Sequence, residues 1–132
     1  MMKISANLIF ICYLFVTSRV EGLKMGKTYV EINNNFLDST TLLVHCKSKD
    51  DNFRVHHITH RWGFAFLPNW FGGTLFFCSF AWSNRFEWFD IYVQDRDWNY
   101  CTKCIWMISA NGPCRLGDSG EYDVCYPWNH RH

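Results

Sequence analysis

The chain places six cysteines in a short segment behind an apolar leader, and this combination limits what it can fold into. Lys3 precedes an apolar run from Ile4 to Val16, and small residues follow at Val20 and Gly22. This pattern is typical of a secretory signal peptide that is cleaved near Gly22. The apolar run is also shorter than the ~20 residues that cross a bilayer. We therefore expect residues 1–22 to be removed and the rest to be secreted, without membrane insertion.

A secreted location decides what the cysteines mean, because disulfides persist outside the cell and supplement the limited core of a small domain. Of the seven cysteines, Cys12 would leave with the leader. The remaining even set predicts up to three disulfides among Cys46, Cys78, Cys101, Cys104, Cys114 and Cys125. Residues 23–132 have the length of one domain, and we expect a single one.

Net charge limits the partners of the mature domain. Cleavage after Gly22 takes the thirteen basic residues to eleven and the twelve acidic residues to eleven, so the formal charge becomes zero with histidine neutral. A neutral domain has no overall electrostatic attraction for nucleic acid or for an anionic membrane. We therefore expect no nucleic-acid partner, and recognition must be local.

Apolar and aromatic residues alternate along most of the segment with a period of two, as in half-buried strands. The predicted strands cover residues 28–32, 40–46, 55–60, 61–66, 74–82, 86–94 and 104–109, and a short final strand follows Gly112. No helix is required. Seven or eight short strands predict an all-β protein, a small antiparallel β-sandwich of Ig-like architecture stapled by disulfides.

Catalytic and metal sites have weak support in this sequence. His56 and His60 share a face of one predicted strand and could serve a metal or acid–base chemistry, but exposed strands often carry such polar residues. The Asp-Arg-Asp run at residues 95–97 reads as a solvated turn, whereas Asp90 is a candidate buried acid. Neither a nucleophile elbow nor a phosphate-binding loop is found. We expect no enzyme, no metal and no cofactor.

Several ordered blocks carry a resemblance to a known family. They are residues 43–51 (LVHCKSKDD), 62–64 (WGF), 69–78 (NWFGGTLFFC), 89–92 (FDIY), 96–97 (RD) and 101–106 (CTKCIW). In this order and at these spacings, the chain resembles the plant self-incompatibility proteins, also called S-protein homologs. The resemblance implies a secreted β-sandwich. The founding members are female determinants of pollen rejection, thought to be ligands of a pollen surface receptor.

Two features depart from the family pattern. The acidic turn typically continues with a third Asp and then Leu-Gly, whereas this chain has Asn52, Phe53 and Arg54. The second departure is a cysteine pair, Cys114 and Cys125, at positions where the pattern has none. We expect these two to bridge each other and to staple a C-terminal loop.

The pairing of the other four cysteines stays open at this point. Cys46 and Cys104 lie on inward faces of predicted strands, which favours a bond between them and leaves Cys78 with Cys101. The swapped pairing of Cys46 with Cys101 is an alternative. A zinc or redox site at the Cys-x-x-Cys is less favoured, because secretion favours disulfides and no βαβ pattern surrounds the pair.

The resemblance and the loops together predict an extracellular signalling ligand that acts through a plant cell-surface receptor. Loops on a rigid scaffold commonly carry specificity, and tryptophan is enriched at interface hot spots. The candidate contact residues are Lys47, Lys49, Asp50, Asp51, Arg54, Trp70, Trp98, Arg115, Asp118 and Glu121. The alternatives are a secreted defence or antimicrobial binding protein and a histidine-dependent secreted hydrolase.

Overall fold

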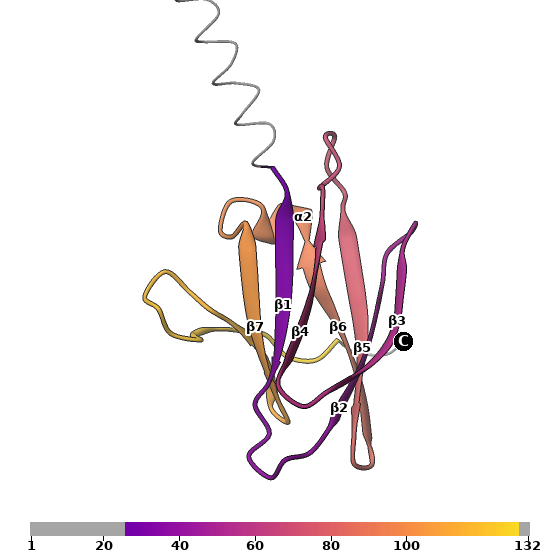
Figure 1. Cartoon of the computed structure of the whole chain (residues 1–132). Coiled ribbons are helices and arrows are strands. Elements are labelled where there is room, and N and C mark those ends of the chain that lie inside the picture. Colours follow the sequence, from indigo (N-terminus) through magenta and orange to yellow (C-terminus); the bar gives the residue numbers. More distant parts are fainter. Residues whose placement is uncertain (1–25, 130–132) are drawn as a thin grey trace, which may run out of the picture.

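The computed structural model describes residues 26–129, so the predicted leader lies outside the described residues. Nine strands and one short helix make up this part (Figure 1): β1 (Thr28–Asn34), β2 (Leu42–Lys47), β3 (Asn52–Ile58), β4 (Arg61–Phe66), β5 (Leu75–Trp82), β6 (Arg85–Val93), α2 (Gln94–Asp97), β7 (Lys103–Ser109), β8 (Gly112–Arg115) and β9 (Val124–Cys125). Within residues 26–129, no helix has the length and apolar character to cross a membrane.

The strands form two sheets, which confirms the predicted all-β sandwich. One sheet has the order β4-β1-β7-β8-β9 and the other the order β3-β2-β5-β6. All neighbouring strands are antiparallel except β1 and β7, which pair in parallel from Tyr29–Lys103 to Asn34–Ile108. The predicted antiparallel arrangement thus holds for every pair except this one, because alternation identifies strands without specifying their neighbours.

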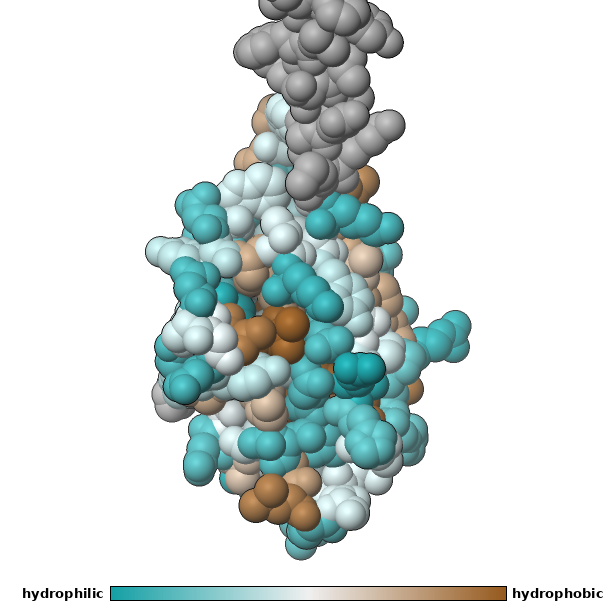
Figure 2. All heavy atoms as spheres, turned by 60° about the vertical axis from the view of Figure 1, so that its left-hand side comes forward, coloured by the Kyte–Doolittle hydropathy of each residue, from teal (hydrophilic) through white to brown (hydrophobic). Residues whose placement is uncertain are grey.

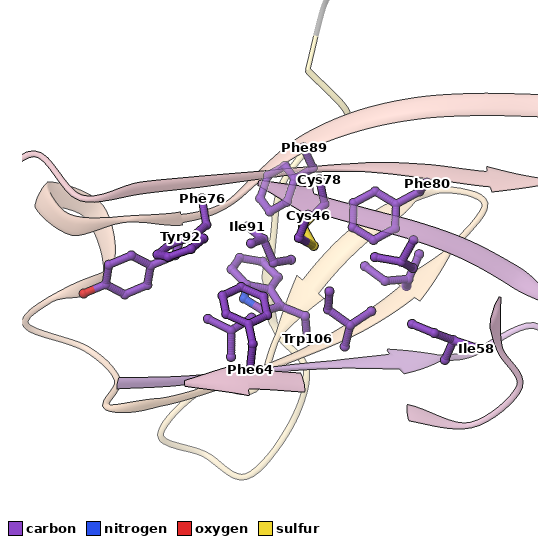
Figure 3. Packing of buried hydrophobic residues seen from close by; sticks show 14 of the residues in the cluster. Cys46, Ile58, Phe64, Phe76, Cys78, Phe80, Phe89, Ile91, Tyr92 and Trp106 are labelled. Atoms are coloured by element: carbon purple, nitrogen blue, oxygen red, sulfur yellow. A yellow bond between two sulfur atoms is a disulfide. The ribbon is translucent and has the colours of Figure 1, made fainter. Parts of the chain in front are cut away.

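The core lies between the two sheets and is rich in aromatic rings (Figure 3). Leu42, Val44 and Cys46 alternate along β2 on the inward face and are fully buried, as the period of two predicts. Trp106 from β7 packs edge-on against Phe89 from β6, with ring centroids 5.0 Å apart. Side chains from both sheets thus fill one continuous layer, which makes the sandwich a rigid support for its loops.

The C-terminal segment closes one side of the sandwich between the sheets. Tyr126 packs against Phe89, and the Trp128 ring packs against Phe80. The backbone N–H of Asn129 then donates to the carbonyl of Trp88 on β6 at 2.8 Å. Although Trp128 lies in a loop, its side chain thus packs against the core and is not directed at solvent.

All six predicted cysteines form disulfides, but two of the favoured pairs are wrong. The observed bonds join Cys46 to Cys78, Cys101 to Cys104, and Cys114 to Cys125. The pairings of Cys46 with Cys104 or with Cys101 fail because Cys46 and Cys78 lie directly opposite each other on adjacent strands β2 and β5. The predicted staple between Cys114 and Cys125 is confirmed.

Peptide mapping without reduction will distinguish these pairings. We expect tryptic peptides 28–47 and 62–85 to stay joined as one pair, and peptides 97–103, 104–115 and 116–131 to stay joined as a separate set of three. Mass spectrometry before and after reduction reads the connectivity directly. A species that joins 28–47 to 104–115 would contradict the observed bonds.

Candidate contact surfaces

The turn between β2 and β3, together with the first residues of β3, presents a dense group of charges; we call residues 47–54 the charged turn. Lys49, Asp50, Asp51 and Arg54 are exposed, whereas Lys47 is half-buried. The Ser48 N–H donates to the Asp51 carbonyl at 2.9 Å, and the Ser48 hydroxyl accepts the Asp51 N–H at 3.1 Å. Internal hydrogen bonds therefore hold this charged turn, as in other turns rich in Ser and Asp.

Arg54 has a backbone conformation that a side chain rarely adopts. Its φ is 63°, in the left-handed region that favours glycine. The Asn52 carboxamide oxygen accepts the Arg54 N–H at 3.0 Å and so supports this conformation. The chain thus places a cation at a strained backbone position. Such strain often accompanies function.

The loop between β8 and β9 is the second charged candidate, and only part of it is on the surface. Asp118 and Glu121 are exposed, and the Ser119 hydroxyl donates to the Asp123 carboxylate at 3.1 Å. Arg115 instead lies in the interior with 5 % of its surface exposed. Direct contact between a partner and this predicted residue is therefore not favoured by its burial.

The predicted contact residues Trp70 and Trp98 lie on one groove, although they are far apart in sequence. The groove has a volume of about 880 Å³ and is lined by both tryptophans together with Leu67, Pro68 and Phe71. Gln94 and Thr28 lie among its polar lining residues. In Figure 1 the groove segments lie at the end where β1 begins, and the β8–β9 loop projects to the left. The charged turn lies at the same end as the groove, because Lys47 at the end of β2 pairs with Phe77 near the start of β5.

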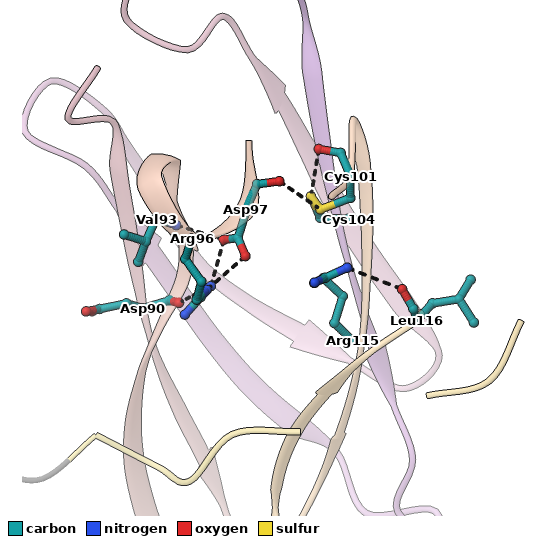
Figure 4. A network of polar contacts seen from close by, with 8 residues as sticks. All are labelled: Asp90, Val93, Arg96, Asp97, Cys101, Cys104, Arg115 and Leu116. Carbon is teal, nitrogen blue, oxygen red and sulfur yellow. Dashed lines mark hydrogen bonds and ion pairs between the residues drawn. A yellow bond between two sulfur atoms is a disulfide. The ribbon is translucent and has the colours of Figure 1, made fainter. Parts of the chain in front are cut away.

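The Asp-Arg-Asp run is a buried network and not the solvated turn that its composition predicts (Figure 4). Asp97 is fully buried and accepts two hydrogen bonds from the Arg96 guanidinium, each at 2.8 Å. The Val93 N–H donates to the same carboxylate at 2.9 Å. Arg96 also donates to the Asp90 carbonyl at 2.9 Å. The Asp90 side chain is only half-buried, so the buried acid is Asp97.

A buried hydroxyl lies near the groove. Tyr92 is fully buried, and burial raises the pKa of its hydroxyl above the usual value. Thr28, which lines the groove, interacts with this hydroxyl and opposes the pKa shift.

The histidines take structural positions that sequence could not assign. The His56 ring stacks on Trp62, with centroids 4.2 Å apart, and its Nε2 contacts the Phe53 carbonyl at 2.7 Å. β3 ends at Ile58, so His60 lies beyond the strand and lines a second, polar cavity with Arg61. In the part of the chain that the structure describes, no three His, Cys, Asp or Glu side chains are placed to hold a metal ion.

Comparisons with known proteins agree with the resemblance. A family model described as plant self-incompatibility protein S1 matches residues 29–128. S-protein homolog 29 of Arabidopsis thaliana is 42% identical over 123 residues, which cover 90% of this chain and 91% of that protein. S-protein homolog 2 of the same plant is 48% identical over 112 residues, covering 79% and 70%. S-protein homolog 5 is 38% identical over 122 residues, covering 90% and 93%. No solved structure matches the chain.

Proposed function

Since the chain belongs to the plant self-incompatibility protein S1 family, we propose that it is a secreted ligand for a cell-surface receptor of plant cells. The protein is related to self-incompatibility proteins by this membership. Secretion fits the predicted leader and the three disulfides, since oxidised pairs persist outside the cell. The resemblance implies that the founding members are ligands of a receptor, and the proposal extends this role to the present chain.

The charged turn between β2 and β3 carries this proposal. Its four exposed charges stand on a backbone held by internal hydrogen bonds, and Cys46 at the end of β2 is bonded to β5. A turn that is already ordered loses little conformational entropy on binding. Opposite charges that are fixed in place discriminate between partners, because a wrong partner meets like charges.

Binding to intact cells tests the proposal. Protein purified from the medium of cells that express the full-length chain is labelled and added to pollen and to vegetative plant cells. We expect saturable binding that a reduced and alkylated sample lacks, because reduction removes the disulfides that hold the loops. Binding to pollen alone supports a role in pollen recognition, and binding to vegetative cells supports another signalling role. Failure to bind either contradicts the proposal.

Replacing Arg54 separates binding from stability. We expect Arg54→Gly to raise the free energy of unfolding by about 1 kcal/mol, because glycine adopts a φ of 63° without strain. We expect the same variant to weaken saturable cell binding, because it removes an exposed cation from the charged turn. Urea unfolding and the cell-binding assay measure the two effects.

Arg54→Lys is the matched control, since it keeps both the cation and the strained backbone. This variant should bind like the wild type and show no gain in stability. If Arg54→Gly binds with unchanged affinity, Arg54 is not part of the receptor contact.

A further inference from the structure

Large apolar side chains gather at one end of the sandwich. Six of the nine large hydrophobic residues that are exposed in the described chain lie in the β4–β5 loop, at the start of β5, or just after α2. We call this surface the apolar end; it comprises Leu67, Trp70, Phe71, Leu75, Trp98 and Tyr100. The face shown in Figure 2 is by contrast mainly hydrophilic, with one small apolar area near its centre and another at its lower end. Apolar patches of this kind mark interaction sites.

The two most exposed side chains of the apolar end project outward instead of packing against the protein. Phe71 is 93% exposed and Trp70 is 76% exposed. The following Gly72 and Gly73 have φ angles of 91° and 85°, and both face open space. The loop therefore forms a protruding tip that carries exposed aromatic side chains. Such a tip can enter the interfacial layer of a membrane or a pocket of another protein.

Four backbone N–H groups of this tip have hydrogen-bond acceptors within the protein. The N–H of Asn69 donates to the Thr74 hydroxyl at 2.6 Å, and the N–H of Phe71 donates to the Asn69 carboxamide at 3.1 Å. The Gly72 N–H donates to the Asn69 carbonyl, and the Thr74 N–H donates to the Gln94 carboxamide, both at 3.0 Å. Lipid cannot supply hydrogen bonds to backbone, whereas a protein partner can. The hydrogen bonds that the protein supplies to these four N–H groups lower the cost of placing the tip in lipid.

Residue types and charges agree with a membrane surface. Tryptophan and tyrosine, here Trp70, Trp98 and Tyr100, favour the boundary between headgroups and acyl chains. The groove lining contains no charged side chain. Three exposed charged residues are direct sequence neighbours of residues that line the groove. Two of them, Lys27 and Lys103, are cations, and Asp95 is an anion. The excess of one positive charge next to the groove lining favours anionic over neutral headgroups.

We propose that the apolar end docks the protein on a phospholipid membrane, with Trp70 and Phe71 in the interfacial layer. Docking of this kind requires no spanning segment, because a few aromatic side chains and nearby cations supply the attraction. The membrane thus becomes a second binding partner, beyond the proposed receptor, and concentrates the ligand at the cell surface.

Co-sedimentation with vesicles tests the docking without any receptor. Protein purified from the medium of expressing cells is mixed with phosphatidylcholine vesicles, or with vesicles that also contain phosphatidylserine. We expect sedimentation with both, and more with phosphatidylserine. The double variant Trp70→Ala/Phe71→Ala should lower partitioning by about tenfold or more, given the apolar area that each side chain buries. Because both residues are highly exposed, the variant should keep the near-UV circular dichroism of the wild type.

Leu37→Ala is the matched control. Leu37 is 100% exposed in the loop between β1 and β2, away from the apolar end, and its loss should change nothing. Lys27→Gln/Lys103→Gln should abolish the preference for phosphatidylserine. Absence of sedimentation, or equal sedimentation of the Trp70/Phe71 variant, overturns the proposal. Loss of cell binding in that variant without vesicle binding by the wild type assigns the surface to a protein partner, which also overturns it.

Discussion

Removing the disulfide between Cys46 and Cys78 is expected to destabilise the domain by about 3–4 kcal/mol. The bond closes a loop with a sequence separation of 32 residues, and the entropy that a crosslink removes from the unfolded chain grows with the length of this loop. Both cysteines are fully buried. The double variant Cys46→Ala/Cys78→Ala, unfolded in urea and followed by near-UV circular dichroism, measures the loss.

The Cys101–Cys104 bond provides an internal comparison. Its sequence separation is only 3 residues, so Cys101→Ala/Cys104→Ala should cost about half as much, roughly 1.5–2 kcal/mol. Each double variant removes one whole disulfide and leaves the other two bonds of the described residues in place. Equal losses in the two variants would contradict an origin in the length of the closed loop.

The sequence predicts the strands well because their burial has a simple period. In β2 and β7, every second residue is buried, and the buried positions are those at which the sequence has the predicted inward-facing residues. The pairing of strands has no such local signature. Cys46 and Cys104 both point inward, as predicted, yet they belong to different sheets, and the partner of Cys46 is the cysteine in register on the adjacent strand. Alternation identifies the face of a strand but not its neighbour.

The candidate contact surfaces also combine features that the sequence predicts with features that depend on contacts distant in the chain. The sequence places Trp70 and Trp98 among the candidate contact residues, and in the structure they are 76% and 49% exposed. Their meeting on one groove depends on the hydrogen bonds between Gln94 and the β4–β5 loop, which connect residues far apart in the chain. Arg115 was expected on the surface because a charged residue next to a loop usually lies in water. In the structure it is buried. Burial of Asp97 was missed because a four-residue helix is too short to show a periodic pattern.

Replacing Asp97 with alanine is the second change with a large expected effect, a loss of about 3 kcal/mol or more. The carboxylate is fully buried and pairs with Arg96, whose side chain is 22% exposed. Asp97→Ala would leave the Arg96 cation without a counter-charge and the Val93 N–H without its acceptor. The free energy of unfolding, obtained from urea titration at neutral pH, measures this effect.

Asp95→Ala is the control, because Asp95 lies in the same helix, carries the same charge and is exposed. It should change the free energy of unfolding by less than about 0.5 kcal/mol. Arg96→Ala/Asp97→Ala adds a second comparison, since removing both charges avoids an unpaired buried cation.

Arg96 lies over three aromatic rings, with its guanidinium carbon 4.8 Å from the centroid of the Tyr126 ring and slightly farther from those of Phe89 and Trp106. The network therefore connects α2, both sheets and the C-terminal segment. If its main contribution is charge pairing, the double variant will be more stable than Asp97→Ala alone. If its main contribution is the packing of Arg96 on the rings, the double variant will be the less stable of the two.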